Sequence, residues 1–367
     1  MDYGSRGMHP GLPGKKKINI LITGHRGYIG TVLVPVLAEA GYQDLAGLDS
    51  GLFRESALYP VPEIPVRETW KDIRDVEPGD LDGIDCIIHL AGLSNDPLGN
   101  LDPSLTMDIN LHATVRLARL AREAGVKRFI FSSTCSVYGF SSGQALTEEA
   151  TANPMTPYAD SKFLAELSLL ELADQRFSPV ILRSATAYGI SPMLRFDLVV
   201  NNLVAWALAT GFIHLKSDGT AWRPLVHVND IARTMVRVVG ASVDAVYKQV
   251  INVGSNGNNF RIIDIARMIE NCIAGTRLRF DDHARKDNRN YHVSFTKLNA
   301  MFPDLGDAYP IEKAIHELCE HLAPMELDIE DFEGPRFCRI ACIQSLLQRK
   351  LVDEELRFSR LSVSCAR

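Results

Sequence analysis

Short apolar runs alternate with stretches of helical periodicity along the first half of the chain. The apolar runs, bounded by glycine and polar residues, predict buried strands at residues 18–23, 45–48, 84–90, 129–132 and 179–182. Apolar residues at helical spacing between them predict helices at residues 28–40, 103–124 and 157–173. Buried strands that alternate with helices are typical of a parallel sheet covered by helices on both faces. The pattern therefore predicts an α/β protein with a doubly wound, Rossmann-type sheet.

The second half of the chain is less regular. Its periodicity predicts a strand and three helices, at residues 250–253, 197–209, 228–239 and 262–273. We expect a dinucleotide-binding domain over residues 15–189 and a smaller α/β substrate domain over 190–322, which partly returns to the sheet. Residues 1–14 hold four glycines and two prolines and predict a disordered leader. Residues 323–367 form an extension to which the pattern assigns no role, with one predicted helix at 336–350.

Composition narrows the classes of function. The 45 acidic and 39 basic side chains leave a net charge of −6, which disfavours a nucleic-acid or acidic-membrane binder. No apolar run reaches about 18 residues, so we expect no membrane span. The seven cysteines include no C-x-x-C pair, which disfavours a disulfide framework and a zinc site, and no metal is expected. Since an apolar leader is also lacking, these features predict a cytoplasmic protein.

A glycine-rich turn follows the first predicted strand. Gly24, Gly27 and Gly30 form a G-x-x-G-x-x-G pattern that opens the next helix, whose free N–H groups suit phosphates. Asp49 ends the second strand, 19 residues past the last glycine. A carboxylate there suits the adenosine ribose and repels a 2′-phosphate, which favours NAD over NADP. Arg26 in the turn is the counter-argument, because its cation could hold that phosphate.

A tyrosine and a lysine supply candidate catalytic groups. Tyr158 and Lys162 are four residues apart in a predicted helix, so both side chains share one face. A free phenol has a pKa near about 10 and is a poor base at neutral pH. We expect a nearby ammonium and the positive nicotinamide ring to lower the pKa of Tyr158. Thr134 follows another strand, at the carboxyl edge where ligands bind, and can share the proton of the substrate oxygen with Tyr158.

With these motifs the chain resembles the extended short-chain dehydrogenases/reductases. The resemblance is to their nucleotide-sugar epimerase/dehydratase branch, of the UDP-glucose/galactose 4-epimerase type. It extends from about residue 17 to about residue 310. Its further motifs are Asp72-Ile73-Arg74, Leu90-Ala91-Gly92, Asn110, the Ser-Ser-Thr at 132–134 and the Arg-Pro-Leu-Val-His-Val-Asn-Asp at 223–230.

The resemblance implies a role for each matching position. NAD would be held by Gly24, Arg26, Gly27, Tyr28, Ile29, Gly30, Asp49, Asp72, Ile73, Leu90, Ala91, Gly92, Ser132, Tyr158, Lys162 and Thr186. Within this set, Asp72 and Ile73 would contact adenine, and residues 90–92 would lie under the nicotinamide ribose. The catalytic residues would be Thr134, Tyr158, Lys162 and Asn110, the last of which orders an active-site water.

A nucleotide-sugar substrate follows from the same resemblance. Its binding residues would be Ser94, Thr134, Asn201, Asn202, Leu203, Arg223 and Arg289. The planar guanidinium groups of Arg223 and Arg289 suit bidentate binding of a diphosphate. The resemblance also implies a homodimer that pairs the helices holding Asn110 and Tyr158.

Two departures from the family pattern bear on the reaction. Dehydratases have an Asp-Glu pair for eliminating water where this chain has Cys135 and Ser136, so a 4,6-dehydratase is disfavoured. Thr186 stands where the family usually has an asparagine, which changes one polar contact. The leading hypothesis is an NAD-dependent nucleotide-sugar 4-epimerase that works through a transient 4-keto sugar. The alternative is an NAD(P)-dependent reductase or dehydrogenase of a nucleotide-linked ketosugar.

A third hypothesis is a non-catalytic NAD-binding sensor, which would have no need for the catalytic residues together. Cys135 could act as an acid or base in a 3- or 5-epimerisation, or simply pack behind the site. We favour packing for Cys135, and packing or capping for His89 and His227, over catalytic roles.

Overall fold

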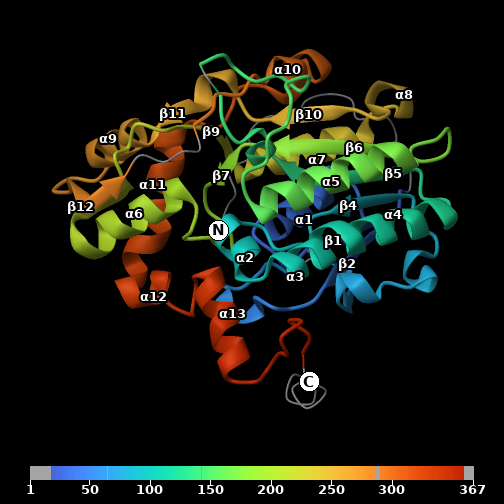
Figure 1. Ribbon diagram of the computed structural model, residues 1–367, viewed down its shortest axis with the longest axis horizontal. Coiled ribbons are helices and arrows are strands. Elements are labelled where there is room, and N and C mark those ends of the chain that lie inside the picture. The colour runs from blue at the N-terminus through green and yellow to red at the C-terminus, as the bar shows by residue number, and fades with distance from the viewer. Residues whose placement is uncertain (1–17, 64, 142, 286–289, 359–367) are drawn as a thin grey trace.

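The computed structural model describes residues 18–63, 65–141, 143–285 and 290–358 (Figure 1). Its centre is a seven-stranded parallel sheet with the strand order β10-β6-β5-β4-β1-β2-β3. Its strands are β1 (Ile20–Thr23), β2 (Leu45–Asp49), β3 (Arg67–Trp70), β4 (Cys86–His89), β5 (Arg128–Thr134), β6 (Ser178–Ser184) and β10 (Val250–Val253). The order reverses at β1, which confirms the doubly wound α/β fold and marks the crevice where such sheets bind ligands.

Most strands of this sheet lie where the hydrophobic pattern predicted them, within two residues at either end. The exception is β3, which the sequence did not predict. Its side chains are mostly exposed, and Trp70 is 54% exposed, because β3 forms the edge of the sheet. An edge strand of this kind lacks the apolar run by which a buried parallel strand is found.

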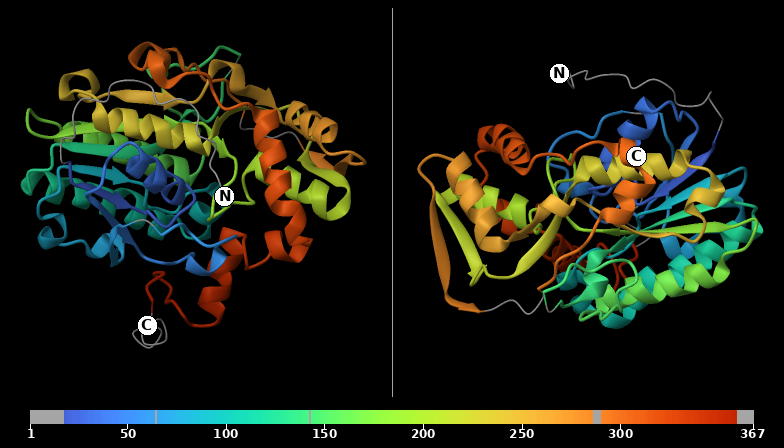
Figure 2. Two further views of the ribbon diagram at one scale, coloured as in Figure 1. Left: turned by 180° about the vertical axis from the view of Figure 1, so that it is seen from behind. Right: turned by 90° about the horizontal axis from the view of Figure 1, so that it is seen from above.

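Helices cover both faces of the sheet, as Figure 2 shows from two further directions. Helices α1 (Gly30–Glu39) and α7 (Val228–Gly240) pack on one face, and α4 (Ala113–Glu123) and α5 (Pro157–Leu172) pack on the other. The helix predicted at 103–124 is divided into α3 (Pro103–Met107), a π-helical turn (Asp108–His112) and α4, and is preceded by α2 (Asp96–Leu101). The other helices predicted before residue 323 begin and end within two residues of their predicted limits, whereas the one predicted at 336–350 begins three residues later, at Arg339.

A smaller lobe has its own apolar core. Its strands are β7 (Thr186–Tyr188), β9 (Trp222–His227) and β11 (Asn259–Arg261) in one sheet, and β8 (Phe212–Ser217) with β12 (Arg277–Arg285) in another. Its helices are α6 (Val199–Thr210), α9 (Ile262–Cys272) and α11 (Ile311–Leu322). Between these elements in the chain, β10 joins the main sheet and α7 packs against it, so the chain partly returns to the first lobe. Two further helices are short: α8 (Val243–Val246) and α10 (Thr296–Met301).

The C-terminal extension, residues 323–358 in the described part, spans both lobes. It contains α12 (Ile329–Glu333) and α13 (Arg339–Gln348), drawn in red along the lower edge of Figure 1, within the region of the predicted helix 336–350. Phe332 and Phe337 are buried in the core of the smaller lobe, whereas Ile343 and Leu346 are buried against the main sheet. No helix in the described residues is long and apolar enough to cross a membrane.

Candidate active site

A cleft of about 920 Å³ lies between the smaller lobe and the carboxyl ends of the central strands. Most of the predicted site residues line it: Gly24, Gly27, Tyr28, Ile29, Gly30, Asp49, Asp72, Ile73, Leu90, Ala91, Gly92, Ser94, Ser132, Thr134, Tyr158, Lys162, Thr186, Asn202, Leu203 and Arg223. Arg26, Asn110 and Asn201 are not part of this lining. Arg289 lies outside the described residues.

The turn after β1 fits the phosphates of a dinucleotide. Gly24 has a φ of +74°, and a Cβ there would lie 2.7 Å from the backbone nitrogen of Ala91, so the two loops can approach only because this residue is glycine. Helix α1 begins at Gly30, directly behind the turn, and both line the cleft. The positive end of the helix dipole therefore lies at the cleft, as the binding of a pyrophosphate requires.

Asp49, at the end of β2, has the position of a ribose-binding carboxylate. It accepts from the backbone N–H groups of Arg26 (3.1 Å) and Gly51 (2.8 Å), and a carboxylate has further lone pairs for ribose hydroxyls. The Arg26 guanidinium pairs with Glu68 on β3. Because Glu68 holds the cation that could have bound a 2′-phosphate, this arrangement favours NAD, as predicted.

Asp72 has a partner that sequence reasoning missed. Its two carboxylate oxygens accept from Nε (2.9 Å) and Nη2 (2.7 Å) of Arg74. Burial raises the pKa of Asp72, but the hydrogen bonds and charge of Arg74 outweigh it and leave that pKa below its usual value. Asp72 and Ile73 both line the cleft, and their contact with adenine remains a prediction.

Tyr158 and Thr134 both line the cleft, and the Thr134 side chain is close enough to lower the pKa of Tyr158. Thr156 caps α5 and places Tyr158 in its first turn, whereas Thr134 ends β5 and accepts from the backbone N–H of Ser136 (3.1 Å). Burial raises the pKa of Tyr158 to about 12, opposed first by the charge of Arg195 and then by Thr134. Tyr158 is therefore protonated at neutral pH, as the proton-donating form of the pair.

Lys162 lies one turn further along α5. Its Nζ donates to the carbonyl oxygen of Ser132 (3.0 Å) and would lie 3.8 Å from a Cβ at Gly92, the loop predicted to lie under the nicotinamide ribose. Burial lowers the pKa of Lys162 to about 8, and Glu166 opposes this shift. The charge that acts most on Tyr158 belongs to Arg195 and not, as expected, to Lys162.

Asn110 joins three segments behind the cleft. It lies in the π-helical turn, where its side-chain nitrogen donates to the Leu93 carbonyl (2.9 Å) and the Ser161 hydroxyl (3.1 Å). Its side-chain oxygen accepts from the Leu93 N–H (2.8 Å). These bonds make Asn110 a positioning residue for the loop after β4 and for α5. Its predicted ordering of a water remains a prediction.

Arg195 and Asp197 complete the cleft beside Tyr158, and sequence reasoning missed both. Nε and Nη2 of Arg195 donate to the two oxygens of Asp197 (3.0 and 2.6 Å), and Nη1 donates to the Ser94 hydroxyl (2.9 Å). Burial raises the pKa of Asp197, but Arg195 outweighs it and the pKa falls to about 2. The pair therefore stays ionised. Its only signal in the sequence is an arginine two residues before an aspartate, which predicts no site.

Comparison with known proteins places this geometry in a family. The model of the NAD dependent epimerase/dehydratase family matches residues 20–254, well over half of the chain. The chain belongs to this family. The UDP-glucose 4-epimerase of Bacillus subtilis (strain 168) is 28% identical to it over 279 residues, which cover 68% of this chain and 81% of that protein. The UDP-glucuronate 4-epimerase of Thermodesulfobacterium geofontis (strain OPF15) is 28% identical over 218 residues, covering 59% and 63%.

Solved structures of similar fold include MoeE5 in complex with UDP-glucose and NAD. It is 25% identical, with a TM-score of 0.71 over 84% of this chain and 99% of that chain. An NAD-dependent NDP-hexosamine 5,6-dehydratase, TunA, has a TM-score of 0.73 at 23% identity and covers 85% and 99%. The doubly wound fold and the family together make this protein an NAD-dependent enzyme.

In this family member Cys135, the residue after Thr134, faces away from the cleft. The Cys135 thiol is 1% exposed and donates to the Arg183 carbonyl (3.2 Å), and burial raises its pKa. Packing behind the site, the favoured interpretation, is confirmed. Ser136 does line the cleft, where its hydroxyl accepts from that of Thr134 (3.1 Å).

The two histidines have the structural roles that were favoured. His89 is buried between the hydroxyls of Thr23 (2.6 Å) and Thr114 (2.8 Å), and burial lowers its pKa to about 3. His227 is buried at the N-terminus of α7, where its side chain accepts from the backbone N–H of Asn229 (3.3 Å). Both are therefore neutral at physiological pH.

The substrate half of the cleft agrees only in part with the prediction. Asn201 is fully buried, accepts from the Gly189 N–H (3.0 Å) and donates to the Arg195 carbonyl (3.0 Å), so its side chain supports the loop instead of lining the cleft. Asn202 lines the cleft and donates to Glu333 of the C-terminal extension (3.3 Å). A helix presents consecutive residues in different directions, which is why only one of the two asparagines reaches the cleft.

Arg223, the predicted diphosphate ligand, is nine-tenths buried and lines the cleft. Its Nη1 donates to the Trp222 carbonyl (2.8 Å), and its guanidinium lies 5.7 Å from the centre of the Tyr291 ring. Thr186 also lines the cleft, at the start of β7.

Proposed function

We propose that this family member is a nucleotide-sugar 4-epimerase that works through a transient 4-keto sugar. The observation that carries the proposal is that Tyr158 and Thr134 line one cleft, while Cys135 and Ser136 occupy the two positions at which dehydratases have their Asp-Glu pair. Cys135 faces away from the cleft, and Ser136 offers only a hydroxyl. Such a site can move one proton and one hydride at one carbon, which is what 4-epimerisation needs.

The residues divide this work between them. When bound, NAD supplies the acceptor and donor for a hydride at the sugar carbon. In its phenolate form, Tyr158 would take the proton of the C4 hydroxyl and later return it, while the Thr134 hydroxyl would hold the same oxygen. Arg195 favours the phenolate form of Tyr158, because it is the strongest opposing charge in the site. Lys162 would hold the nicotinamide ribose beside Gly92.

The named activities of its relatives support a UDP-linked hexose as substrate. The relatives described above are a UDP-glucose and a UDP-glucuronate 4-epimerase. Arg223 provides a cation for the substrate diphosphate, with Asn202 and Leu203 beside it in the cleft lining. Ser94, held by Arg195, lies at the end of the cleft that contains Tyr158, where the sugar would lie.

The proposal is tested by incubating the purified protein with UDP-, dTDP-, GDP- and CDP-sugars without added cofactor. We expect a stereoisomer at C4, seen by NMR, with no net change in absorbance at 340 nm. Conversion that requires added NADH or NADPH, with stoichiometric loss of that absorbance, would make the protein a ketosugar reductase instead. No turnover under any of these conditions would count against catalysis.

Assembly as a homodimer through α4 and α5 belongs to the same proposal. It is supported by Leu167, an apolar residue of α5 that is 45% exposed. Light scattering is expected to give twice the chain mass, and Leu167→Glu is expected to reduce it to the monomer. A cytoplasmic location is proposed as well, and it is supported by the free state of the six described cysteines.

A further inference from the structure

A buried cation on the C-terminal extension lacks a partner for part of its guanidinium group. Arg339 is the first residue of α13 and is only 4% exposed. Its Nη2 donates to the carbonyl oxygen of Met193 (3.2 Å). Its Nη1 is buried and has no hydrogen-bond partner within the described part of the chain. A buried charge in this state is costly to the fold unless an anion completes its hydrogen bonds.

The surroundings of Arg339 belong to the cofactor half of the cleft. Its guanidinium carbon lies 4.5 Å from the centre of the Phe53 ring, four residues past Asp49. Arg339 lines the cleft together with Asp49 and the glycine turn. Burial, followed by the charge of Arg195, lowers the pKa of Arg339 to about 10, so it remains charged at neutral pH.

The helix that begins at Arg339 adds to this positive potential. Helix α13 has ten residues, and its N-terminal residues 338–340 line the same cleft as the N-terminus of α1. The first N–H groups of a helix have no partner within the helix, and its dipole is positive at this end. The N-termini of two helices and a buried arginine whose Nη1 has no hydrogen bond therefore line the same cleft.

The C-terminal extension is tied to the smaller lobe on one side of this space. Glu333, at the end of α12, accepts hydrogen bonds from three side chains of that lobe: Asn202 (3.3 Å), Trp206 (3.1 Å) and Lys216 (3.1 Å). Burial raises the pKa of Glu333, but the cation and these bonds outweigh it and keep the carboxylate ionised.

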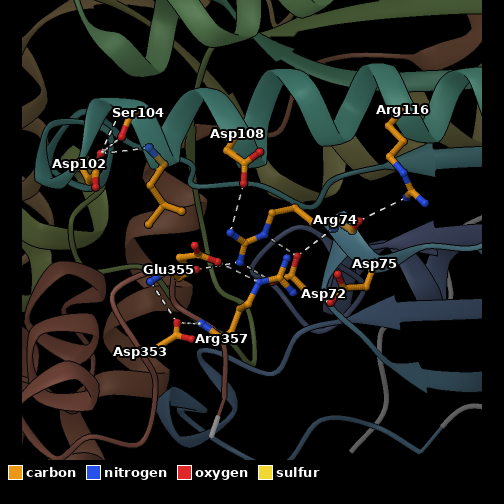
Figure 3. Close-up of polar contacts among 11 residues, drawn as sticks. Asp72, Arg74, Asp75, Asp102, Ser104, Asp108, Arg116, Asp353, Glu355 and Arg357 are labelled. Carbon is orange, nitrogen blue, oxygen red and sulfur yellow. Dashed lines mark hydrogen bonds and ion pairs between the residues drawn. The ribbon is translucent and has the colours of Figure 1, made fainter.

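On the other side, the extension is tied to the predicted adenine end (Figure 3). Arg74, already paired with Asp72, donates to the carbonyl oxygen of Glu355 (2.7 Å), and Arg357 pairs with Asp75 (2.5 Å). Leu356, between these two anchors, lines the cleft with Ile73. The extension thus crosses the cofactor half of the cleft from one lobe to the other.

We propose that the C-terminal extension completes the NAD site, with Arg339 donating hydrogen bonds to the pyrophosphate of the dinucleotide. The pyrophosphate supplies the anion that the free Nη1 lacks, in a charge-assisted pair that excludes water. This inference rests on the use of NAD and not on the proposed 4-epimerisation. It also explains how one NAD molecule could be retained while a keto sugar turns over.

Two other phosphates are less well placed to be the ligand of Arg339. The diphosphate of a sugar nucleotide has Arg223, on the smaller lobe, as its cation. The 2′-phosphate of NADP would lie against the carboxylate of Asp49, which repels it. The pyrophosphate of NAD would lie at the glycine turn, which lines the same cleft as Asp49 and Arg339.

The test compares Arg339→Met, Arg339→Lys and the matched control Arg336→Met in the full chain. Arg336 lies three residues earlier, is exposed and pairs with Asp331. Calorimetry measures the affinity for NAD, NADP, ADP-ribose and adenosine after bound cofactor is removed, with no sugar present. The NAD content of each variant as purified and its melting temperature without ligand are recorded as well.

For Arg339→Met we expect the affinities for NAD and ADP-ribose to fall on the order of 10- to 100-fold. Adenosine, which has no phosphate, is expected to bind as before, Arg339→Lys to recover part of the loss, and Arg336→Met to resemble the wild type. Because an uncompensated charge is removed, the melting temperature of ligand-free Arg339→Met is expected not to fall.

Three results would overturn the inference. One is unchanged affinity for ADP-ribose. Another is an equal loss for adenosine together with a lower melting temperature, which would make Arg339 a purely structural residue. The third is a loss confined to NADP, which would assign Arg339 to the 2′-phosphate. Because no sugar is present, each result stands whether the protein proves to be an epimerase or a reductase.

Discussion

The two walls of the cleft are built in different ways. In the sheet wall, formed by the residues that follow β1, β2 and β5 and by the start of α5, each group is placed by the end of a strand or helix. Gly24, Asp49 and Thr134 are of this kind. In the lobe wall, formed by residues 193–203 and the C-terminal extension, side chains are placed by distant partners. Arg195 is held by Ser94 and Asn202 by Glu333, 101 and 131 residues away.

The two walls therefore make different contributions: one holds the groups proposed to transfer the proton, and the other holds buried cations that set the electrostatic potential. The sheet wall holds Tyr158 and Thr134, which we propose act on the reacting oxygen, on backbone that regular hydrogen bonding already positions. The lobe wall supplies the buried cations Arg195 and Arg339, each of which bonds a residue more than 100 positions away, Ser94 and Met193 respectively. Substitutions in the sheet wall should therefore remove the reaction, whereas those in the lobe wall should shift its pH dependence or its cofactor affinity.

The sharpest test of the sheet wall is Tyr158→Phe. Loss of the phenol should reduce turnover on the order of 10²- to 10⁴-fold, the usual contribution of a general acid–base. NAD content should be unchanged, because the ring remains. Tyr42→Phe, outside the cleft lining, serves as the matched control and should retain activity. Near wild-type turnover in Tyr158→Phe would contradict the proposed mechanism.

In the sheet wall, the buried amine of Lys162 should lower the free energy of unfolding of the ligand-free protein at neutral pH. Its folded pKa of about 8 is below the ordinary lysine value of 10.5. Between these two pH values only the unfolded chain holds the proton, so the free energy of unfolding rises with pH there. Relative to Lys162→Met, the ligand-free wild type should gain about 3 kcal/mol between pH 8 and pH 10.5.

Urea unfolding at a series of pH values measures this gain. The exposed Lys127 provides the control, since Lys127→Met should keep the wild-type pH dependence. Parallel curves for Lys162→Met and the wild type would mean that Lys162 is fully charged in the folded protein.

In the lobe wall, the double variant Arg195→Met/Asp197→Asn removes the cation without leaving an unpaired carboxylate. The pKa of Tyr158 should rise, because Arg195 is the largest charge that lowers it. Activity at neutral pH should then fall about tenfold, and the rise of kcat/KM with pH should move to higher pH. Asp197→Asn alone keeps the cation and should not move that rise upward. An unmoved profile in the double variant would remove Arg195 from the electrostatic account.

The smallest effect is expected behind the sheet wall, at Cys135. Its thiol bonds the Arg183 carbonyl and faces away from the cleft, so Cys135→Ala should keep kcat/KM within about twofold. Native protein should also resist alkylation at this thiol, since burial raises its pKa. A loss of activity comparable to that of Tyr158→Phe would restore an acid–base role for Cys135.

The sheet wall was largely predictable from the chain. The apolar runs located six strands of the main sheet, and motif spacing located Gly24, Tyr158 and Lys162 in what proves to be one cleft. These signals are local, because a strand or helix face is encoded within about ten residues. Strand β3 was not predicted, because an exposed edge strand has no apolar run in its sequence.

The lobe wall was not predictable in this way. Asn201 and Asn202 are adjacent and equally polar, and only the orientation of α6 brings one of them to the cleft. The importance of Arg195 depends on its contacts with Asp197 and Ser94, and no short motif records such a pairing.

The chain thus encodes locally its alternation of strands and helices, its dinucleotide turn and its tyrosine–lysine pair, because each depends on the periodicity or spacing of nearby residues. The packing of the two lobes decided which buried groups meet across the cleft. Tertiary packing also turned Cys135 toward the carbonyl of Arg183, 48 residues later in the chain, and brought Arg339 against Met193, 146 residues earlier. Such contacts form only when distant segments bury their apolar surfaces together, and no short sequence pattern encodes them.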